Sequence, residues 1–170
     1  MKQMKKILML ALVMSGFAAE AFSQGATATA TATATIVAPI AISKTVDMNF
    51  GNVAVNNTAG TVVLSPAGAR SVTGGCTLPA TAGTVAAASF TVTGTTGYTY
   101  AITLPSTPTT ISFGGIDMTV SNFTSSPTPT GTLAGGTSTL TVGATLNVGA
   151  SQAAGLYVSG TPFTVRVDYN

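Results

Sequence analysis

Apolar and polar residues alternate along most of this chain, which predicts a protein built from β-strands. The clearest stretch runs from Leu140 to Val148, where every second residue is apolar and the residues between are polar or glycine. A period of two puts one face of a strand against a core and the other against solvent. The same pattern recurs at 98–104, 116–121 and 163–169, with shorter candidates at 61–65 and 88–94.

Short clusters of Gly, Pro, Asn and Ser separate these stretches, as expected for turns. No segment after residue 23 shows the 3.6-residue period of a helix. We therefore expect an all-β protein with a single antiparallel immunoglobulin-like or pilin-like β-sandwich of about seven to nine strands. Tyr98 and Tyr100 share the parity of Ile102 and Leu104, which predicts that both tyrosines lie in the core.

The longest alternation lies near the N-terminus, where Ala and Thr alternate from Ala26 to Thr35. The even positions stay apolar as far as Phe50, interrupted by Lys44. At about 3.3 Å per residue this segment would span roughly 80 Å, whereas a sandwich strand spans about 17–20 Å. The segment is therefore too long for one strand of its own domain.

Pro39 marks the expected break in this segment, because proline has no N–H to donate to a sheet. We divide the chain there into an extended N-terminal strand at 24–38 and a β-sandwich domain at 39–170. The first strand of the domain is expected at 40–50.

Three interpretations of residues 26–38 stay open. The segment could pair within its own domain, act as a flexible linker, or add as a donor strand to the sheet edge of a neighbouring subunit. Regular alternation with β-branched threonine argues against the linker. For the donor interpretation, the candidate subunit-interaction residues are the even positions of the extension and the inward face of the last strand: Ala28, Ala30, Ala32, Ala34, Ile36, Phe163, Val165, Val167 and Tyr169.

The first residues have the organisation of a secretory signal peptide. Lys2, Lys5 and Lys6 precede a short apolar run at 7–14, and small residues at 21 and 23 fit cleavage before residue 24. The run is too short to span a bilayer. We expect residues 1–23 to be removed from an exported protein, which passes through the periplasm to the cell surface or the medium and has no membrane span.

Without that segment the chain has no net charge. It keeps three basic and three acidic residues: Lys44, Arg70, Arg166, Asp47, Asp117 and Asp168. This balance offers no electrostatic footprint for nucleic acid or for an anionic membrane, and a net charge near zero favours association. Threonine, at 32 residues in the whole chain, dominates the polar positions instead, as strands exposed to solvent tolerate.

The residues that catalysis or metal binding would need are missing. The absence of histidine excludes Ser-His-Asp and Cys-His arrangements and zinc sites of the His/Cys type. Each of the three aspartates lies on the polar face of an alternating strand, which indicates solvated positions. Cys76 is the only cysteine, so no intramolecular disulfide can form, and we expect it to be a small buried hydrophobe. The sequence predicts a non-enzymatic protein with no cofactor and no metal.

Three segments resemble a known family. They are GTVVLSPAGARSVTGG (60–75), ATATATIVAPIAISKTVDMNFGN (30–52) and LTVGATLNVGASQAAGLYVSGTPFTVRVDYN (140–170). These segments are similar to secreted bacterial proteins grouped as domain of unknown function 4402. The resemblance covers nearly the whole chain after the signal peptide. It implies a fold and carries no activity.

The chain also resembles, more loosely, pilin subunits of the chaperone–usher type, especially the archaic and spore-coat-U-like branches. Those subunits end in an alternating apolar strand with a tyrosine next to last, as Tyr169 is here. They also carry an alternating N-terminal extension that completes a neighbour's incomplete sandwich. This resemblance implies a periplasmic chaperone and an outer-membrane usher as further partners. The cysteine pair common in such subunits is absent, since Cys76 stands alone.

These observations favour a structural subunit of a bacterial surface filament, of the fimbria or pilus kind. It would assemble by β-strand exchange with itself or related subunits, for adhesion or biofilm scaffolding. The alternative is a self-contained monomeric binding module, an exported adhesin or matrix protein that recognises glycan or protein through its loops. Its candidate loops are 104–110 and 124–136, where Pro and Gly cluster.

Overall fold

The computed structural model describes residues 25–170, so the signal peptide predicted at 1–23 lies outside the described residues. The chain divides into two units, Met1–Thr35 and Ile36–Asn170. In the first unit, residues 25–35 form no strand or helix, and every one of them is exposed. The second unit forms the folded domain.

The domain is all-β, as predicted, and the described residues contain eleven strands and no helix. Two of the strands are only 3 and 2 residues long, too short to show a period of two, which explains why the predicted number was lower. The strands are β1 (Ala41–Val46), β2 (Ala54–Leu64), β3 (Arg70–Thr77), β4 (Ala88–Thr93), β5 (Thr99–Thr103), β6 (Thr109–Phe113), β7 (Ile116–Ser126), β8 (Thr130–Thr132), β9 (Thr137–Val148), β10 (Val158–Ser159) and β11 (Arg166–Tyr169).

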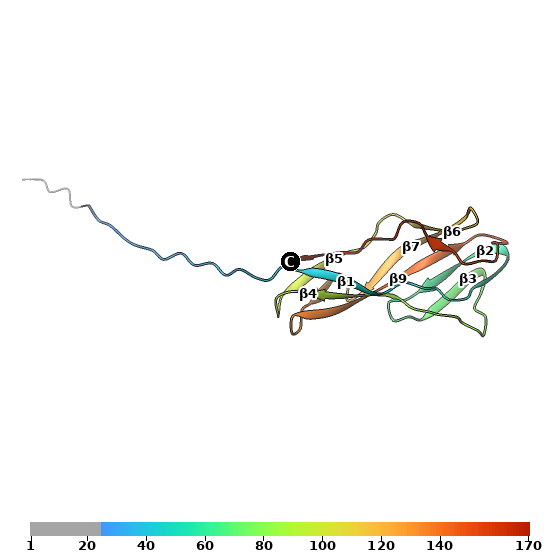
Figure 1. Ribbon diagram of the computed structural model, residues 1–170, viewed down its shortest axis with the longest axis horizontal. Coiled ribbons are helices and arrows are strands. Elements are labelled where there is room, and N and C mark those ends of the chain that lie inside the picture. The colour runs from blue at the N-terminus through green and yellow to red at the C-terminus, as the bar shows by residue number, and fades with distance from the viewer. Residues whose placement is uncertain (1–24) are drawn as a thin grey trace, which may run out of the picture. The chain divides into compact units, whose positions relative to one another are not determined.

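The strands form a large curled sheet and a small sheet, which together make the predicted antiparallel sandwich (Figure 1). The large sheet has the order β1-β4-β9-β7-β6-β10, with β2 also paired to β9 and β3 to β2. The small sheet has the order β11-β5-β8. The centre of the large sheet is β9, which pairs with β7 along one edge and with β4 and then β2 along the other. Gly143 lies where the partner changes, and a Cβ there would overlap the Leu64 carbonyl.

The apolar core has two parts. The first lies between the small sheet and the large sheet and includes Tyr100, Leu133 and Leu140. Residues near the C-terminus join it: Val165 and Val167 are buried, and Phe163 and Tyr169 pack against this part of the core. The strand predicted at 163–169 is shorter than expected, because β11 begins at Arg166. The second part lies on β2, β3, β7 and the later half of β9: Val62, Cys76, Val120, Ala144, Leu146 and Val148.

The first strand is shorter than the strand expected at 40–50. It ends at Val46, and its pairing with β4 shifts register between Lys44 and Val46. This irregularity turns Val46 outward, where it is 43% exposed. Met48 and Phe50 return to the core. The single phase expected from residue 26 to residue 50 is therefore wrong at Val46.

The prediction that Tyr98 lies in the core is also wrong. Tyr98 is 44% exposed, whereas Tyr100 is fully buried as expected. The reason is that β5 begins at Thr99, so Tyr98 precedes the strand. Its ring instead packs edge-on against Tyr169, with the ring centroids 5.5 Å apart.

A bulge in β7 brings Phe123 into the core. The pairing of β7 with β9 shifts between Ser121 and Thr124, and Asn122 has a φ of 50°. Such a bulge places one extra residue in one strand and reverses the parity beyond it. Phe123 therefore packs against both parts of the core, although a strict period of two would place it with Asp117 on the solvent face.

Candidate functional site

The first and last strands of the domain are both sheet edges. Among the described residues, β1 pairs with β4 alone and β11 pairs with β5 alone. β1 ends the large sheet, β11 ends the small sheet, and the two strands lie near each other (Figure 1). We call these two neighbouring edges the seam. Each edge presents backbone N–H and C=O groups that a further strand could pair with.

The core side of the seam carries four of the predicted interaction residues. Phe163, Val165, Val167 and Tyr169 all belong to the first part of the core or pack against it. The Phe163 ring lies 4.9 Å from the Phe123 ring, centroid to centroid. The structure thus brings these four residues together on one face, as the alternation predicts.

The other predicted interaction residues belong to the extension. Ala28, Ala30, Ala32 and Ala34 lie in the first unit, where they are exposed and belong to no strand. Ile36 begins the second unit and is 92% exposed. Burial of this exposed apolar side chain against a partner would be favourable, because it removes apolar surface from water.

The hydroxyl of Tyr169 takes part in a ring of three hydrogen bonds at the start of the domain. The Thr95 N–H donates to this hydroxyl at 2.7 Å, and the hydroxyl donates to the Ala38 carbonyl at 2.8 Å. The Ala38 N–H donates to Thr95 Oγ1 at 3.0 Å. The ring ties the last strand to the residue at which the extension meets the domain. The sequence did not predict the role of Thr95, because nothing distinguishes it from its neighbours in the TGTTG turn.

Replacement of Tyr169 by phenylalanine is expected to lower the free energy of unfolding by about 1 kcal/mol. The change removes the shared partner of the part-buried Thr95 N–H and the exposed Ala38 carbonyl, and a typical hydrogen bond contributes about that much. Chemical unfolding followed by circular dichroism measures the loss. Tyr98→Phe is the control, because no hydrogen bond of the Tyr98 hydroxyl is found among the described residues. An equal loss in both variants would contradict the role of the ring.

The charged side chains lie apart from one another rather than in a cluster. Lys44 pairs with Asp47 at 2.6 Å, and Arg166 pairs with Asp168 at 2.7 Å, which raises the pKa of the exposed Arg166 guanidinium. Arg70 donates to the carbonyls of Phe50 and Asn52 and holds the turn at Gly51, while Asp117 accepts from Ser112 at 2.6 Å. Within residues 25–170 no group of acids, cysteine or histidine is placed to hold a metal ion.

Cys76 is buried in the second part of the core, as predicted. Burial raises the pKa of its thiol above the ordinary value of 9.0. The folded protein therefore holds this proton at pH values where the unfolded chain loses it.

The free energy of unfolding is accordingly expected to fall as the pH rises above about 9, by up to about 1.4 kcal/mol per pH unit from this group. Unfolding of the wild-type protein and of Cys76→Ala between pH 7 and pH 10 measures the effect. The stability advantage of the wild-type protein should shrink with pH. A difference that stays constant across this range would show that the thiol ionises equally in both states.

A shallow depression of about 660 Å³ lies beside β6. The segments 104–110 and 160–164 line most of it, and its lining residues are uncharged, with several prolines and threonines. One of the two loops considered for ligand binding, 104–110, therefore borders a concave surface. Much of the other, 124–136, is not loop, because it contains the end of β7 and all of β8.

The fold and the seam define the class of this protein: an all-β sandwich domain whose first and last strands, within the described residues, each pair on one side alone. Its chain belongs to the family Domain of unknown function (DUF4402), whose model matches residues 40–169. This match confirms the resemblance to that family, whereas the resemblance to pilins stays a prediction. Searches of curated proteins and of solved structures gave no significant match. In the part of the chain that the structure describes, no helix is long and apolar enough to cross a membrane.

Proposed function

We propose that this protein is a non-enzymatic structural subunit of a bacterial surface filament, assembled by β-strand exchange. The extension at 26–38 of one copy is the donor, and the free edge of β11 in the next copy is the acceptor. The subunit is exported, reaches the cell surface through the periplasm, and has copies of itself or related subunits as partners. A periplasmic chaperone and an outer-membrane usher would hold and deliver the unpaired strand. The filament serves adhesion or biofilm scaffolding.

One observation carries this proposal: β11 has a ladder partner on one side alone among the described residues, although the strand faces the core through Val167, with buried Val165 just before it. A buried strand at an open edge is a ready template for a further strand. Strand addition obtains affinity from main-chain hydrogen bonds and specificity from the side chains that alternate toward the core. The extension supplies the matching alternation, because its even positions are all apolar.

The sizes of the two sheets also support strand addition. The strands of the small sheet have 3 to 5 residues, whereas β2, β7 and β9 of the large sheet have 11 or 12. The small sheet is therefore too short to cover the whole apolar face of the large one. Partly buried Phe50, Ile111 and Met118 pack against the second part of the core and not against the first, and a donor strand along the seam would extend the cover toward them.

An SDS gel of protein sheared from the cell surface, with unboiled and boiled samples side by side, tests the proposal. Strand-exchanged fibres should resist cold detergent, because many ladder bonds must break together before a subunit is released. We expect a ladder of oligomers that collapses to a monomer on boiling. A single monomer band in both lanes would overturn the proposal.

The monomeric binding module is the second candidate, supported by the depression between segments 104–110 and 160–164. Its open, uncharged lining suits a neutral ligand such as a glycan or a peptide loop more than a charged one. If the protein is a monomer in both lanes, screening glycans and matrix proteins against wild type and a Ser106→Trp variant would test this candidate. Loss of binding in the variant would place the ligand at the depression.

A further inference from the structure

At the end of the β6–β7 hairpin, the inner face of the large sheet carries apolar side chains that are exposed. Phe113 and Ile116 lie directly opposite each other and are 41% and 45% exposed. They continue the faces of Ile111 and Met118, which pack into the second part of the core. The Tyr157 ring lies 5.7 Å from the Phe113 ring. We call Phe113, Ile116 and Tyr157 the hairpin patch.

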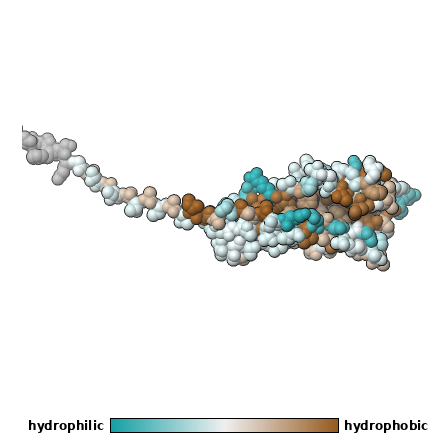
Figure 2. Space-filling model, in the orientation of Figure 1, coloured by the Kyte–Doolittle hydropathy of each residue, from teal (hydrophilic) through white to brown (hydrophobic). Residues whose placement is uncertain are grey.

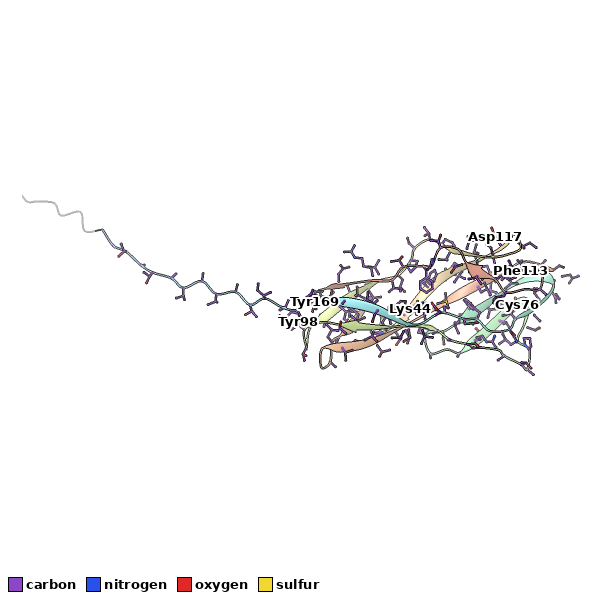
Figure 3. All side chains as sticks on the ribbon, in the orientation of Figure 1. Lys44, Cys76, Tyr98, Phe113, Asp117 and Tyr169 are labelled. Carbon is purple, nitrogen blue, oxygen red and sulfur yellow. The ribbon has the colours of Figure 1, made fainter. Side chains whose placement is uncertain are left out.

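The hairpin patch lies at the opposite end of the domain from Tyr169. Figure 3 places Phe113 and Asp117 at one end and Tyr98 and Tyr169 at the other. In Figure 2, brown apolar atoms reach the surface over the half of the domain that contains β6 and β7, among paler polar atoms. The seam begins beside Tyr169 and leads toward this half.

We infer that Ile36 of a second copy of this chain is the anchor of strand exchange and packs against the hairpin patch. The inference rests on the proposed function and adds to it the register and the direction of the donor strand. Ile36 is the one large apolar side chain at the even positions of the extension, since the other even positions from residue 26 to residue 38 are alanines. It is also almost fully exposed in its own domain.

The register follows from strand parity. Residues directly opposite each other in an antiparallel pair share one face, so the even positions of the donor must oppose the odd, core-facing positions of the last strand. Pairing Ala26 with Tyr169 satisfies this rule along β11. Counting one donor residue for each acceptor residue through 160–165, which form no strand, places Ile36 opposite Ser159. The donor segment 26–36 and the acceptor segment 159–169 then have equal lengths.

Ser159 lies two residues after Tyr157 of the hairpin patch. It lies in β10, directly opposite Ile111 of β6, and therefore shares the inner face of the large sheet. β10 is also a sheet edge among the described residues, since it pairs with β6 alone. A donor strand opposite residues 159–169 would thus find an open edge of the small sheet at β11 and an open edge of the large sheet at β10, on either side of the irregular residues 160–165. The small side chain of Ser159 leaves room for Ile36 beside Tyr157.

The antiparallel direction also determines how copies are arranged. Ile36 leads directly into its own domain, so placing it at the hairpin patch puts that domain beyond the far end of the acceptor. The extension of the acceptor starts at the other end, beside Tyr169. Each copy can therefore donate and accept at once, which generates an open filament. A parallel donor would instead bring two Tyr169 ends together and stop at a pair.

The first test is assembly of the full chain with Ile36→Ser. We expect the protein concentration at half assembly, measured by light scattering, to rise on the order of tenfold or more, because an apolar side chain no longer leaves water. Phe113→Ser should give a similar rise from the acceptor side. The control is Val63→Ser, since Val63 is an exposed valine on β2 outside the seam and the patch. Equal assembly of Ile36→Ser and Val63→Ser would overturn the inference.

The second test is a disulfide between Ile36→Cys and Ser159→Cys, in a chain that also carries Cys76→Ala. Oxidation should give a ladder of covalent multimers on a non-reducing gel. An oxidised monomer would show that the pair closes within one chain, and this result would overturn the inference, as would the absence of any disulfide. If the wild-type chain assembles while both tests fail, the anchor is wrong and the proposed function stands. If the wild-type chain does not assemble, both the anchor and the proposed function are wrong.

Discussion

Replacement of Tyr100 by alanine is expected to lower the free energy of unfolding by about 3–5 kcal/mol, as for other large aromatic side chains removed from a core. Tyr100 is fully buried in β5, the central strand of the small sheet. Its ring lies over Gly131 of β8, where a Cβ would overlap it, and its hydroxyl donates to Ser138 Oγ of β9 at 2.9 Å. The side chain therefore joins both sheets, and its loss leaves a cavity between them.

A loss of this size is a large part of the roughly 5–15 kcal/mol that stabilises a typical domain. The midpoint of thermal unfolding should fall by roughly 10–20 °C, as measured by circular dichroism. Tyr100→Phe is the matched control: it keeps the ring and loses the hydrogen bond to Ser138, which costs about 1 kcal/mol. If the two variants lost equal stability, the hydroxyl and not the ring would hold the sheets together.

The strand cores could be predicted from the sequence because burial on one face leaves a period of two. Leu140, Val142 and Leu146 of β9 are buried as their alternation indicates, and so are Val165 and Val167 near the C-terminus. The inward side chains alternate regularly through β9 and, near the C-terminus, from the residues just before β11 into that strand, so each apolar residue indicates the face on which it lies. The all-β class and the sandwich followed from such segments.

The errors arose where the backbone departs from regular pairing. Val46 lies at a register shift, Tyr98 lies one residue before its strand, and Phe123 follows a bulge at Asn122. A bulge or a strand end depends on contacts with a partner strand that is distant in sequence. Local alternation contains no information about it. The same limit applies to residues 56–60, whose Asn and Gly are typical of a turn but which lie inside β2 as an irregular stretch between Val55 and Gly60.

The same distinction applies to the candidate site: part of it could be predicted from local alternation and part could not. The inward residues of the last strand could be predicted, because they belong to an alternating segment. The identity of the sheet edges could not, since the order of strands follows from pairings among segments far apart in sequence. The hairpin patch was missed for a related reason: Ile116 has the parity of an inward residue in the segment predicted at 116–121, yet it is 45% exposed opposite Phe113 at the end of the hairpin.

The extension itself offers the sharpest test of strand exchange, because its two faces can be altered one residue apart. Ala30→Asp is expected to weaken assembly by a factor on the order of one thousand, since it would bury an unpaired carboxylate at a cost of several kcal/mol. Thr31→Asp places the same charge on the opposite face, where a surface substitution changes binding by roughly twofold. Neither change should alter the unfolding of the domain, because residues 25–35 are all exposed.

The two variants have the same net charge, so a general effect of charge on association would weaken assembly equally in both. Assembly differs between them only if one face of the extension is buried and the other is exposed. Light scattering of the full chain at a series of concentrations measures the difference. Equal and strong loss in both variants would mean that the extension is buried on both faces or that association depends on net charge. Equal assembly in both would mean that residues 26–36 serve as a linker, and the alternation of alanine and threonine would then have no part in holding subunits together.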